Sequence, residues 1–581
     1  MRFWRVPESY RRRQTESRFR LLVVVLVGAI GLWYVSSKLK SPKPPNIVFI
    51  LADDLGYKDL GAYGSSFYET PNLDRLAAGG LRFTNAYATC PVCSPSRASL
   101  MTGKYPARVG ITDWIPGRQD WFGPAPTDKL MSLPFTLNLS PHNETTVATL
   151  LRKAGYSTYF VGKWHLGEDE TTWPEYHGFD VNIAGWKAGH PWDGYFSPYH
   201  NPRLSDGPSG EYLTDRLTSE AIDLLKSHFS GLASWFTEPK PVFLWLAYYQ
   251  VHIPLEAKEV DILKFRNKAE RMFPAHQDGS DLRIEEHSSN FIHEEWMKRA
   301  PYADPPFRVR VQQNHPTYAA MVHSLDWNIG RLDAALQQLG LAENTVVFFM
   351  SDNGGLSTSE GSPTSNLPLR GGKGWLYEGG IREPLIIRWP NVIAPDSVCH
   401  TPVTGADVFP TLLNLANCSA GSCSSDIPRF HASNLDGMDL LPLLRTFMKS
   451  TDSQSSPSNL KYMRVLEGRS IFWHYPHYSN QGSKPGSAIR RGDMKLIHFL
   501  EDDTLELYNV TADIGELHNL ATSPSMSSTA RSLLRLLKLW KSRLGARGMV
   551  PNPNYDPLYK PSRNGTFVSG TCAGKNNKKC I

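Results

Sequence analysis

The chain has 581 residues, of which 41% are hydrophobic, 11% aromatic and 20% charged. This composition excludes an intrinsically disordered protein, and the length is sufficient for a large buried core. The net charge of +6 is concentrated at one end: residues 1–43 contain ten basic and two acidic residues, a local charge of +8, so the rest of the chain carries −2. A near-neutral globular part offers no basic surface for nucleic acid, and we expect no nucleic-acid partner.

The N-terminal segment combines a basic tail with an apolar run. We predict a basic cytosolic tail over residues 1–18, a transmembrane signal-anchor over 19–37 and a Pro-rich stem over 38–45. Leu21–Val35 is apolar throughout, and the seven Arg before it favour a cytosolic N-terminus. A cleaved signal peptide is the alternative, because the run is shorter than the ~20 residues that usually span a bilayer.

Both alternatives send the chain after Lys40 into the secretory pathway. With the anchor retained, the protein is expected to be a single-pass type II protein of the Golgi, lysosome or cell surface, with its main folded part in the lumen or outside the cell. With the segment cleaved, it is expected to be secreted. Candidate N-glycosylation sequons agree with this compartment, and they lie at Asn138, Asn143, Asn417, Asn509 and Asn564.

The seven cysteines cannot all pair with one another. If Cys93 is left out, six remain, and six cysteines allow 15 connectivities. The short spacings favour bridges between Cys418 and Cys423 and between Cys572 and Cys580.

From residue 46 the sequence alternates between short apolar runs and amphipathic segments. Strands are predicted at Asn46–Ala52, Tyr156–Val161, Val242–Tyr249 and Thr345–Met350, and helices at Pro95–Met101, Thr145–Ala154, Tyr212–Phe229 and Pro316–Leu339. Such alternation is typical of a parallel sheet covered by helices on both faces. We therefore predict an α/β three-layer sandwich with a large, mixed but mainly parallel sheet over residues 46–445. Residues 256–311 lose the pattern and are interpreted as an insertion near the site.

The C-terminal part has a different pattern. Residues 446–460 are predicted to be a Ser-rich linker, 461–545 a smaller α+β subdomain and 546–581 a tail. In this subdomain we expect short strands at Arg469–His474, Met494–Phe499 and Leu505–Tyr508, and a helix at Ser527–Leu544.

Polar residues follow the ends of four predicted strands: Asp53 and Asp54, then Lys163 and His165, then His252, then Asp352 and Asn353. In an open α/β sheet, ligands bind outside the carboxyl ends of the strands. Each of these residues alone is explained as a turn or cap residue. Together, the carboxylates and the amide form an oxygen-only ligand set, which suits calcium or magnesium and not zinc.

Cys93 begins the sequence Cys-Ser-Pro-Ser-Arg, directly before a predicted helix that Gly103 closes. This puts residue 93 at or next to a helix N-terminus, where backbone N–H groups and the helix dipole favour an anion. An isolated cysteine in that position is more often a structural thiol or half of a disulfide.

The whole run from Cys93 to Lys104 (CSPSRASLMTGK) resembles the signature of the formylglycine-dependent sulfatases, which belong to the alkaline phosphatase superfamily. In that family, the Cys of C-x-P-x-R is oxidised to formylglycine (3-oxoalanine). The similarity continues, in order, at ADDLG (52–56), GKWHLG (162–167), QVHIP (250–254), SDNGG (351–355), LRGGK (369–373) and YEGGIR (377–382). It covers roughly residues 46–520 and implies an alkaline-phosphatase-like fold and a sulfuric ester hydrolase of the arylsulfatase type.

The resemblance implies a role for each matched residue. Four residues, with the formylglycine made from Cys93, would hold calcium, magnesium being less expected: Asp53, Asp54, Asp352 and Asn353. Arg97 and Lys163 would orient the hydrated aldehyde, which attacks sulfur in a two-step covalent route. His252 and Lys373 would bind the sulfate and protonate the leaving oxygen, and His165 would take the proton that releases the sulfate. A formylglycine-generating enzyme is an implied partner during synthesis.

Substrate recognition is expected in residues 185–199 and 212–215, which are rich in aromatic and polar side chains. The candidate residues are His190, Asp193, Tyr195 and Asp215, and a purely structural loop is the alternative reading. The resemblance here is to sulfatases that act on galactose or N-acetylgalactosamine sulfates, so we expect a sulfated glycan, or a small sulfate ester, more than a lipid or steroid sulfate. Two other functions stay open: a phosphonate or phosphodiester hydrolase of the same superfamily, and a membrane-anchored glycan-binding pseudoenzyme, against which the filled catalytic positions argue.

Overall fold

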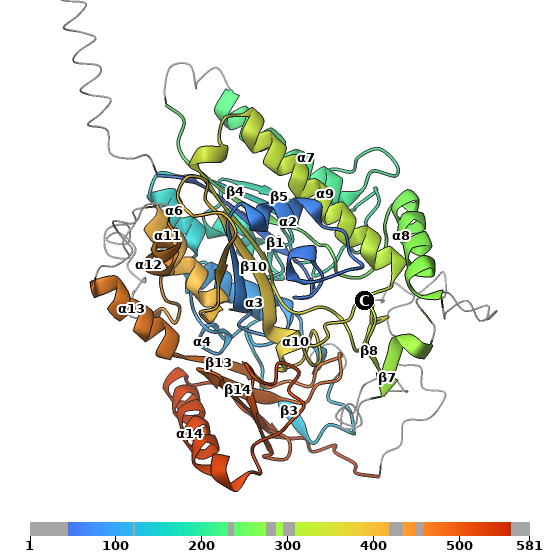
Figure 1. Ribbon diagram of the computed structural model, residues 1–581, viewed down its shortest axis with the longest axis vertical. Helices are drawn as coiled ribbons and strands as arrows, with labels where there is room; N and C mark the ends of the chain where they lie inside the picture. The colour runs from blue at the N-terminus through green and yellow to red at the C-terminus, as the bar shows by residue number, and fades with distance from the viewer. Residues whose placement is uncertain are drawn as a thin grey trace, which may run out of the picture. The chain divides into compact units, whose positions relative to one another are not determined.

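The computed structural model in Figure 1 describes most of the chain from residue 44 onward, namely residues 44–119, 123–230, 238–274, 286, 288–293, 308–416, 434–448 and 457–558. The predicted cytosolic tail and anchor, the sequons at Asn417 and Asn564, and the two favoured disulfides lie outside these residues. No helix within the described ranges is both long enough and apolar enough to cross a membrane. Contacts divide the chain after Pro45, and the fold below is that of the unit beginning at Asn46.

A large sheet forms the centre of this unit, and within the described chain it has nine strands. The strands are β1 (Asn46–Ala52), β2 (Leu81–Tyr87), β4 (Ser157–Gly162), β5 (Val181–Ile183), β6 (Val242–Ala247), β9 (Thr345–Ser351), β10 (Arg382–Arg388), β11 (Ser397–Cys399) and β12 (Val403–Thr404). Their order is β11-β2-β10-β9-β1-β6-β4-β5, with β12 also paired to β2. Strand β10 runs antiparallel to both of its neighbours, and every other pairing is parallel.

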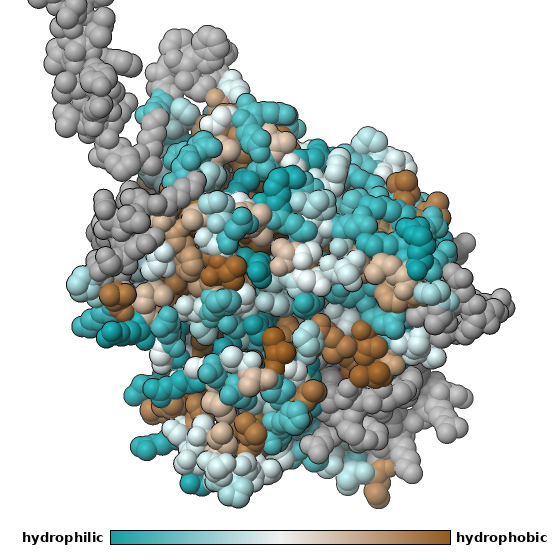
Figure 2. All heavy atoms as spheres, viewed as in Figure 1, coloured by the Kyte–Doolittle hydropathy of each residue, from teal (hydrophilic) through white to brown (hydrophobic). Residues whose placement is uncertain are grey.

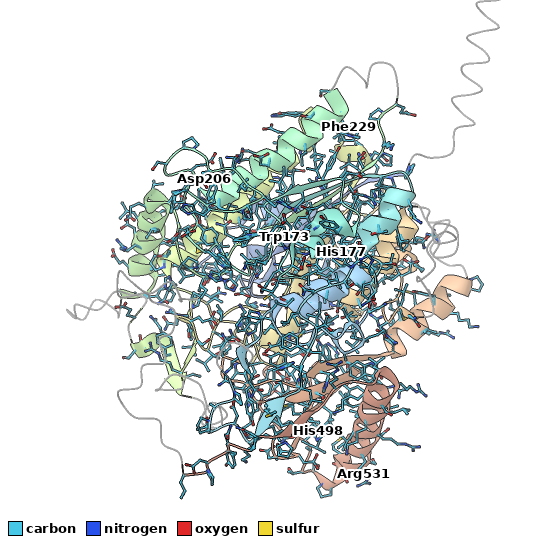
Figure 3. All side chains as sticks on the ribbon, turned by 180° about the vertical axis from the view of Figure 1, so that it is seen from behind. Trp173, His177, Asp206, Phe229, His498 and Arg531 are labelled. Carbon is cyan, nitrogen blue, oxygen red and sulfur yellow. The ribbon has the colours of Figure 1, made fainter. Side chains whose placement is uncertain are left out.

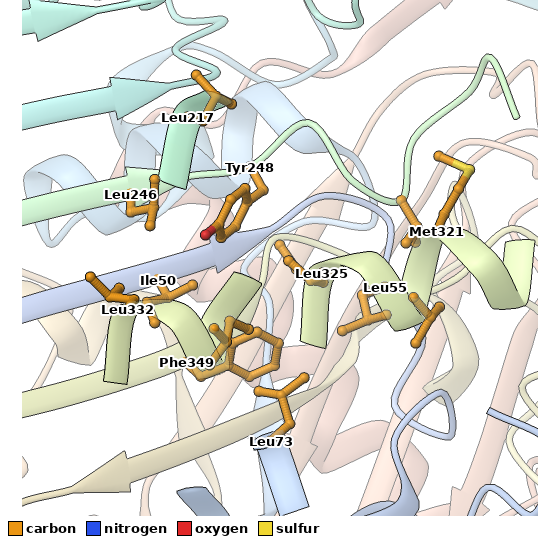
Figure 4. Packing of buried hydrophobic residues seen from close by; sticks show 14 of the residues in the cluster. Ile50, Leu55, Leu73, Leu217, Leu246, Tyr248, Met321, Leu325, Leu332 and Phe349 are labelled. Carbon is orange, nitrogen blue, oxygen red and sulfur yellow. The ribbon is translucent and has the colours of Figure 1, made fainter. Parts of the chain in front are cut away.

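Helices cover both faces of this sheet (Figure 1). One layer contains α2 (Pro71–Ala78), α7 (Leu213–Ser230), α8 (Glu259–Met272) and α9 (Pro316–Gln338), and the other contains α3 (Cys93–Thr102), α6 (Val147–Lys153), α11 (Val408–Leu415) and α12 (Leu441–Leu444). Side chains on a strand point alternately to its two faces. Accordingly, Ile50 of β1 packs in the core between the sheet and α9, as Figure 4 shows. Phe49 packs in the core on the opposite face of the sheet.

The central strands are apolar on both faces because helices cover both faces of the sheet. All positions of β1, β6 and β9 are buried, which explains why their sequences are continuous apolar runs and do not alternate with polar residues. The predicted three-layer α/β sandwich with a mixed, mainly parallel sheet is confirmed. The predicted long helix is also present as α9, and Gly340 follows it with a left-handed φ of 67°.

Residues 256–311 contain regular structure that the sequence pattern did not reveal. Helix α8 packs against α9, and β7 (Phe291–His293) pairs antiparallel with β8 (Arg308–Arg310). Only Phe265 and Ala269 of α8 are buried, so this helix has too narrow an apolar stripe to produce a clear helical period.

The C-terminal part is a second, smaller layered structure. Strands β13 (Ser470–Tyr475), β14 (Gly486–Arg491), β15 (Met494–Phe499) and β16 (Leu505–Asn509) form an antiparallel sheet, which α14 (Ser527–Leu544) covers on one face. Figure 3 shows this region from behind, with His498 on β15 and Arg531 on α14. The other face packs against residues of the first part, among them Tyr87 and Ile381. The predicted C-terminal α+β fold is confirmed.

Two details differ from the predicted boundaries. Helix α13 (Pro457–Gly468) begins inside the predicted linker, and β17 (Met549–Pro551), in the predicted tail, pairs with β3 (Leu130–Ser132). The domain boundaries themselves stay predictions. The face drawn in Figure 2 is mostly hydrophilic, with apolar side chains in small scattered groups.

Candidate active site

The site lies at the carboxyl ends of four strands that are direct neighbours in the order β9-β1-β6-β4. Because these strands are parallel, the residues that follow them meet at one edge of the sheet. Asp352 and Asn353 follow β9, Asp53 and Asp54 follow β1, His252 lies five residues after β6, and Lys163 and His165 follow β4. All seven side chains are buried. The sequence therefore predicted correctly that these residues lie at one edge.

Three carboxylates form the centre of the site. Asp53, Asp54 and Asp352 each offer one oxygen atom, and these atoms lie within 4.8 Å of one another. The backbone N–H of Asp54 donates to Oδ1 of Asp352 at 3.2 Å, and Nδ2 of Asn353 donates to Oδ1 of Asp54 at 2.7 Å. Three buried carboxylates at this spacing repel one another and therefore need positive charge nearby.

Each carboxylate is paired with one buried cation. Lys163 Nζ lies 2.6 Å from Oδ2 of Asp53, Arg97 Nε lies 2.8 Å from Oδ2 of Asp352, and Lys373 Nζ lies 2.7 Å from Oδ2 of Asp54. Arg97 also donates through Nη1 to the backbone carbonyl of Lys163 at 2.8 Å, which ties the end of β4 to α3. The cluster therefore combines three carboxyl groups with three basic groups, and all six side chains are buried.

The oxygen atoms that remain free fit a hard cation. Among the described residues, Oδ1 of Asp53 and Oδ1 of Asn353 have no hydrogen-bond donor, although both are buried. The guanidinium Nη2 of Arg97 lies 3.6 Å from that oxygen of Asp53, too far for a hydrogen bond. Buried oxygens left without a donor are costly unless a cation or water satisfies them. An oxygen-only set of this kind suits calcium or magnesium.

Burial and neighbouring charges shift the pKa values of Asp53 and Asp352 in opposite directions. Burial raises the pKa of Asp53 well above its usual value, even though Lys163 acts in the opposite direction. Burial also acts to raise the pKa of Asp352, but Arg97 and Lys163 outweigh it, and the net pKa is lowered. An added cation would therefore favour the ionised form of Asp53 more than that of Asp352, which its cations already keep ionised.

Cys93 is the first residue of α3 and is buried. Its Sγ lies 3.3 Å from Nδ1 of His165. Nε2 of His165 lies 2.7 Å from the carbonyl oxygen of Ile115, and since a carbonyl can only accept, Nε2 carries the proton and Nδ1 is the acceptor that faces residue 93. Burial, with the charge of Lys163, lowers the pKa of His165 well below its usual value, so the ring is neutral.

Lys373 and His252 form a second pair beside the carboxylates. Nζ of Lys373 lies 3.0 Å from Nε2 of His252, whose Nδ1 donates to the carbonyl of Ile253 at 2.8 Å. Burial and the charge of Lys373 lower the pKa of His252 well below its usual value. Burial alone would lower the pKa of Lys373, but Asp54 and Glu360, together with weaker contributions from Cys93 and Asp53, outweigh this and the net pKa is raised. The pair thus presents a permanent positive charge and a neutral imidazole.

Two site residues adopt a left-handed backbone that is unusual for residues other than glycine. The φ angles are 59° for Asp54 and 55° for His165. Such conformations cost about 1–3 kcal/mol each and persist where the surrounding structure holds them in place, most often at functional sites. Here they turn both side chains toward the cluster.

The predicted substrate residues lie in different environments. The His190 ring stacks on His252 with 6.1 Å between the ring centroids, and burial lowers the pKa of His190 to about 4. Asp193 is half exposed and lies 3.0 Å from Nδ1 of His200. Tyr195 is fully buried, with its hydroxyl 2.9 Å from the carbonyl of His252.

Asp215 lies between helices. It accepts from Asn328 of α9 at 2.7 Å and pairs with Lys258 at 2.5 Å. Asp215 and the buried Tyr195 both contact other parts of the fold, and their role in substrate binding stays a prediction. The sequence did not distinguish a buried structural residue from one that is exposed to a substrate, because burial depends on the packing around each residue.

The candidate sequons and cysteines are placed as follows. Asn143 is exposed, whereas the side-chain oxygens of Asn138 and Asn509 accept backbone hydrogen bonds, from Glu168 at 2.7 Å and from Thr511 at 3.2 Å. Among the described cysteines, Cys90, Cys93 and Cys399 are buried and free. The other four cysteines lie outside the described residues, so the disulfide connectivity stays open.

Two functional contacts escaped sequence reasoning. The carbonyl of Ile115 selects the tautomer of His165, and a backbone carbonyl leaves no motif in the sequence. Gly189 packs against the His165 ring so closely that a Cβ atom there would lie 2.5 Å from Cε1. The glycine itself is the only signal in the sequence for this close approach.

The fold and the site together define a class: an α/β protein that combines a buried carboxylate cluster able to hold a metal ion, a helix N-terminus carrying Cys93, and a buried Lys–His pair at the carboxyl edge of its sheet. The family profile described as Sulfatase matches residues 45–418, and the profile described as N-sulphoglucosamine sulphohydrolase, C-terminal, matches residues 372–543.

Several known proteins are similar to the chain. Steryl-sulfatase of Mus musculus is 32% identical over 439 residues, which cover 70% of this chain and 66% of that protein. N-acetylgalactosamine-6-sulfatase of Rattus norvegicus is 31% identical over 452 residues, which cover 74% of this chain and 70% of that protein. The crystal structure of Ps i-CgsB in complex with k-i-k-neocarrahexaose has a TM-score of 0.60 at 26% identity and covers 86% of this chain and 93% of that chain. The chain belongs to the sulfatase family, and its sheet and helices have the alkaline-phosphatase-like fold of that family.

Proposed function

We propose that this sulfatase hydrolyses sulfate esters of a carbohydrate, with galactose or N-acetylgalactosamine sulfates as the favoured class. The observation that carries the proposal is the position of Cys93, at the N-terminus of α3 and 3.3 Å from the acceptor nitrogen of His165. A group at this position faces a neutral base on one side and the carboxylate cluster on the other. The helix N-terminus favours the negative charge of a bound sulfate.

The metal site consists of Asp53, Asp54, Asp352 and Asn353, and residue 93 completes it. The unpartnered oxygens of Asp53 and Asn353 support this assignment, and the oxygen ligands favour calcium, with magnesium as the less expected ion. When bound, the ion would polarise the sulfate and the attacking oxygen. Arg97 and Lys163 hold the carboxylates of Asp352 and Asp53 in position by ion pairs.

Residue 93 acts after conversion to formylglycine by a formylglycine-generating enzyme. The hydrate of that aldehyde would supply a hydroxyl nucleophile and a second hydroxyl whose deprotonation allows sulfate to leave. His165 takes a proton at Nδ1, because Ile115 occupies Nε2 and the ring is neutral. Lys373 binds a sulfate oxygen through its ammonium group. Nε2 of His252 lies 3.0 Å from that ammonium group, so the pair can deliver a proton from Lys373 to the leaving oxygen.

The carbohydrate class rests on two supports. One is the similarity to N-acetylgalactosamine-6-sulfatase, and the other is the similarity to a sulfatase-like structure solved with a neocarrahexaose. His190 stacks on His252, and Asp193 lies three residues further along the chain. Their polar side chains suit the hydroxyl groups of a sugar better than a steroid. The similarity to steryl-sulfatase makes a steroid sulfate the substrate to test against.

Parallel assays on four substrates test the function. We expect kcat/KM to be highest for a galactose or N-acetylgalactosamine sulfate, lower for an aryl sulfate, and lowest for a steryl sulfate and an aryl phosphodiester. A sulfate ester and a phosphodiester are both singly charged, so the expected preference for sulfate rests on the match to the sulfatase family and not on the charge of Lys373. A higher kcat/KM for the phosphodiester would instead identify a phosphodiester or phosphonate hydrolase, and a lack of turnover with every ester would leave a glycan-binding pseudoenzyme.

We further propose that residues 19–37 anchor the chain in a membrane of the secretory pathway, with the N-terminus in the cytosol. The basic residues before Leu21–Val35 support this orientation, and the exposed Asn143 is the best-placed acceptor for luminal glycosylation. After extraction with alkaline carbonate, the full chain should stay in the membrane pellet, whereas a chain beginning at Ser41 behind a cleavable leader should be soluble. A mature N-terminus near Ser37, with the protein in the soluble fraction, would establish a cleaved signal peptide.

A further inference from the structure

The segment from Trp186 to Tyr195 is attached to the catalytic residues at both ends. At its start, the carbonyl of Trp186 accepts from the backbone N–H of His165 at 3.2 Å, and Gly189 lies against the His165 ring. At its end, the hydroxyl of Tyr195 lies 2.9 Å from the carbonyl of His252. These contacts hold the segment beside the site.

Trp192 lies in a turn in the middle of this segment, where the N–H of Gly194 donates to the carbonyl of Pro191 at 3.2 Å. Trp192 is 50% exposed and Asp193 is also exposed, whereas Pro191 and Gly194 of the same turn are buried. An exposed tryptophan gives up much of the free energy that burial of its large apolar surface provides. The turn therefore presents apolar surface that a ligand can cover.

The Trp192 ring is held in a fixed orientation by two neighbours. Trp186 packs against it with 4.6 Å between ring centroids at 61°, and Nζ of Lys187 lies 5.1 Å from the ring centroid. Trp186 itself is buried, so it provides a rigid base. A ring fixed in advance loses little conformational entropy when a ligand stacks on it.

The turn is close enough to the reaction centre to contact the part of a substrate beyond the ester. Trp192 follows His190 by two residues, so their Cα atoms are at most about 7 Å apart. His190 stacks on His252, the residue beside Lys373. Trp192 therefore lies within reach of a group attached to the sulfated sugar.

We propose that Trp192, held by Trp186 and Lys187, is the stacking surface for a second sugar ring, next to the sugar that carries the sulfate. The apolar face of a pyranose ring packs on an indole ring, while its hydroxyls stay in water. The preferred substrate is then a sulfated oligosaccharide and not a sulfated monosaccharide. This inference rests on the proposed sulfatase function.

A matched control exists elsewhere in the chain. Trp327 of α9 is exposed to a similar extent (47%), and two cations lie near its ring, Lys258 at 5.0 Å and Arg331 at 5.1 Å. It lies on the outer side of a helix and not in the segment that touches His165 and His252. Its replacement reproduces the loss of an exposed, cation-flanked indole without touching the proposed subsite.

The test compares wild type, Trp192→Ala, Trp192→Phe and Trp327→Ala on a sulfated tetrasaccharide, the matching monosaccharide and an aryl sulfate. In the wild type, kcat/KM should be at least about tenfold higher for the tetrasaccharide than for the monosaccharide, a factor that corresponds to 1.4 kcal/mol. Trp192→Ala should remove this preference through KM, Trp192→Phe should keep most of it, and Trp327→Ala should keep all of it. A wild type without the preference, or a Trp192→Ala variant that keeps it or loses kcat/KM equally on all three substrates, overturns the inference.

A binding measurement separates this inference from the proposed function. Calorimetric titration of the tetrasaccharide into Cys93→Ala and into Cys93→Ala/Trp192→Ala requires no turnover. We expect Kd to rise at least about tenfold in the double variant. If the wild type hydrolyses no sulfate ester but this difference in Kd is found, the proposed function fails and the subsite stands. Equal Kd values overturn the subsite whatever the activity.

Discussion

Replacing Cys93 by Ala is expected to lower kcat/KM for an aryl sulfate by at least about 10⁴-fold, the scale of losses on removal of a nucleophile. The substitution removes Sγ, which lies 3.3 Å from Nδ1 of His165, and with it the group that is converted to formylglycine in the proposed mechanism. The fold should be retained, because the side chain is small and lies at the first position of α3. The circular dichroism spectrum and the Tm should stay close to those of wild type.

Cys90→Ala is the matched control for this substitution. Cys90 is also buried and free, and it lies three residues earlier, but it packs in the apolar cluster below β13 and does not face His165. Its replacement should leave kcat/KM within about threefold of wild type. Activity of Cys93→Ala near the wild-type value would contradict the proposed mechanism. The intact mass of the tryptic peptide 83–97 distinguishes an aldehyde from a thiol at residue 93, so an unmodified preparation is recognised before it is assayed.

Removal of metal by chelation is expected to lower activity by at least about 10³-fold, and calcium but not zinc should restore it. The physical reason is the set of buried oxygens without donors on Asp53 and Asn353, which a hard cation satisfies. Asp53→Ala and Asp352→Ala should each raise the Kd for calcium at least about tenfold, as measured by calorimetric titration of the stripped protein. This measurement does not depend on turnover or on modification of Cys93.

Asp326→Asn provides the control for loss of a buried carboxylate. Asp326 of α9 is buried and accepts backbone hydrogen bonds from Asn72 and Leu73 at the start of α2, away from the cluster. Its replacement should lower the free energy of unfolding by about 1–3 kcal/mol and leave the Kd for calcium unchanged. Full activity of the stripped enzyme, or calcium binding to Asp53→Ala with wild-type affinity, would refute the metal assignment.

The sequence alone determined the layered α/β architecture and most of the site. A strand that is buried on both faces is apolar at every position, so β1, β6 and β9 were recognisable as continuous apolar runs. Parallel strands share an edge at their carboxyl ends, so residues as distant in the chain as Asp53 and Asp352 were predicted to meet there. The Cys-Ser-Pro-Ser-Arg sequence also predicted helix α3, which begins at Cys93, two residues before the predicted start at Pro95.

Only the tertiary structure decided which side chains contact one another across that edge. Pairing of β1 with β6 and β9, and reversal of β10, depend on contacts between distant segments that leave no local period. The Ile115 carbonyl on His165 is invisible in the sequence because every residue has a carbonyl group. Tyr195, predicted to bind substrate, is buried under the His252 backbone, whereas Trp192, three residues earlier, is exposed beside the site. Both are aromatic residues of one segment, and only the packing of that segment against His165 and His252 decides which of them is buried and which is exposed.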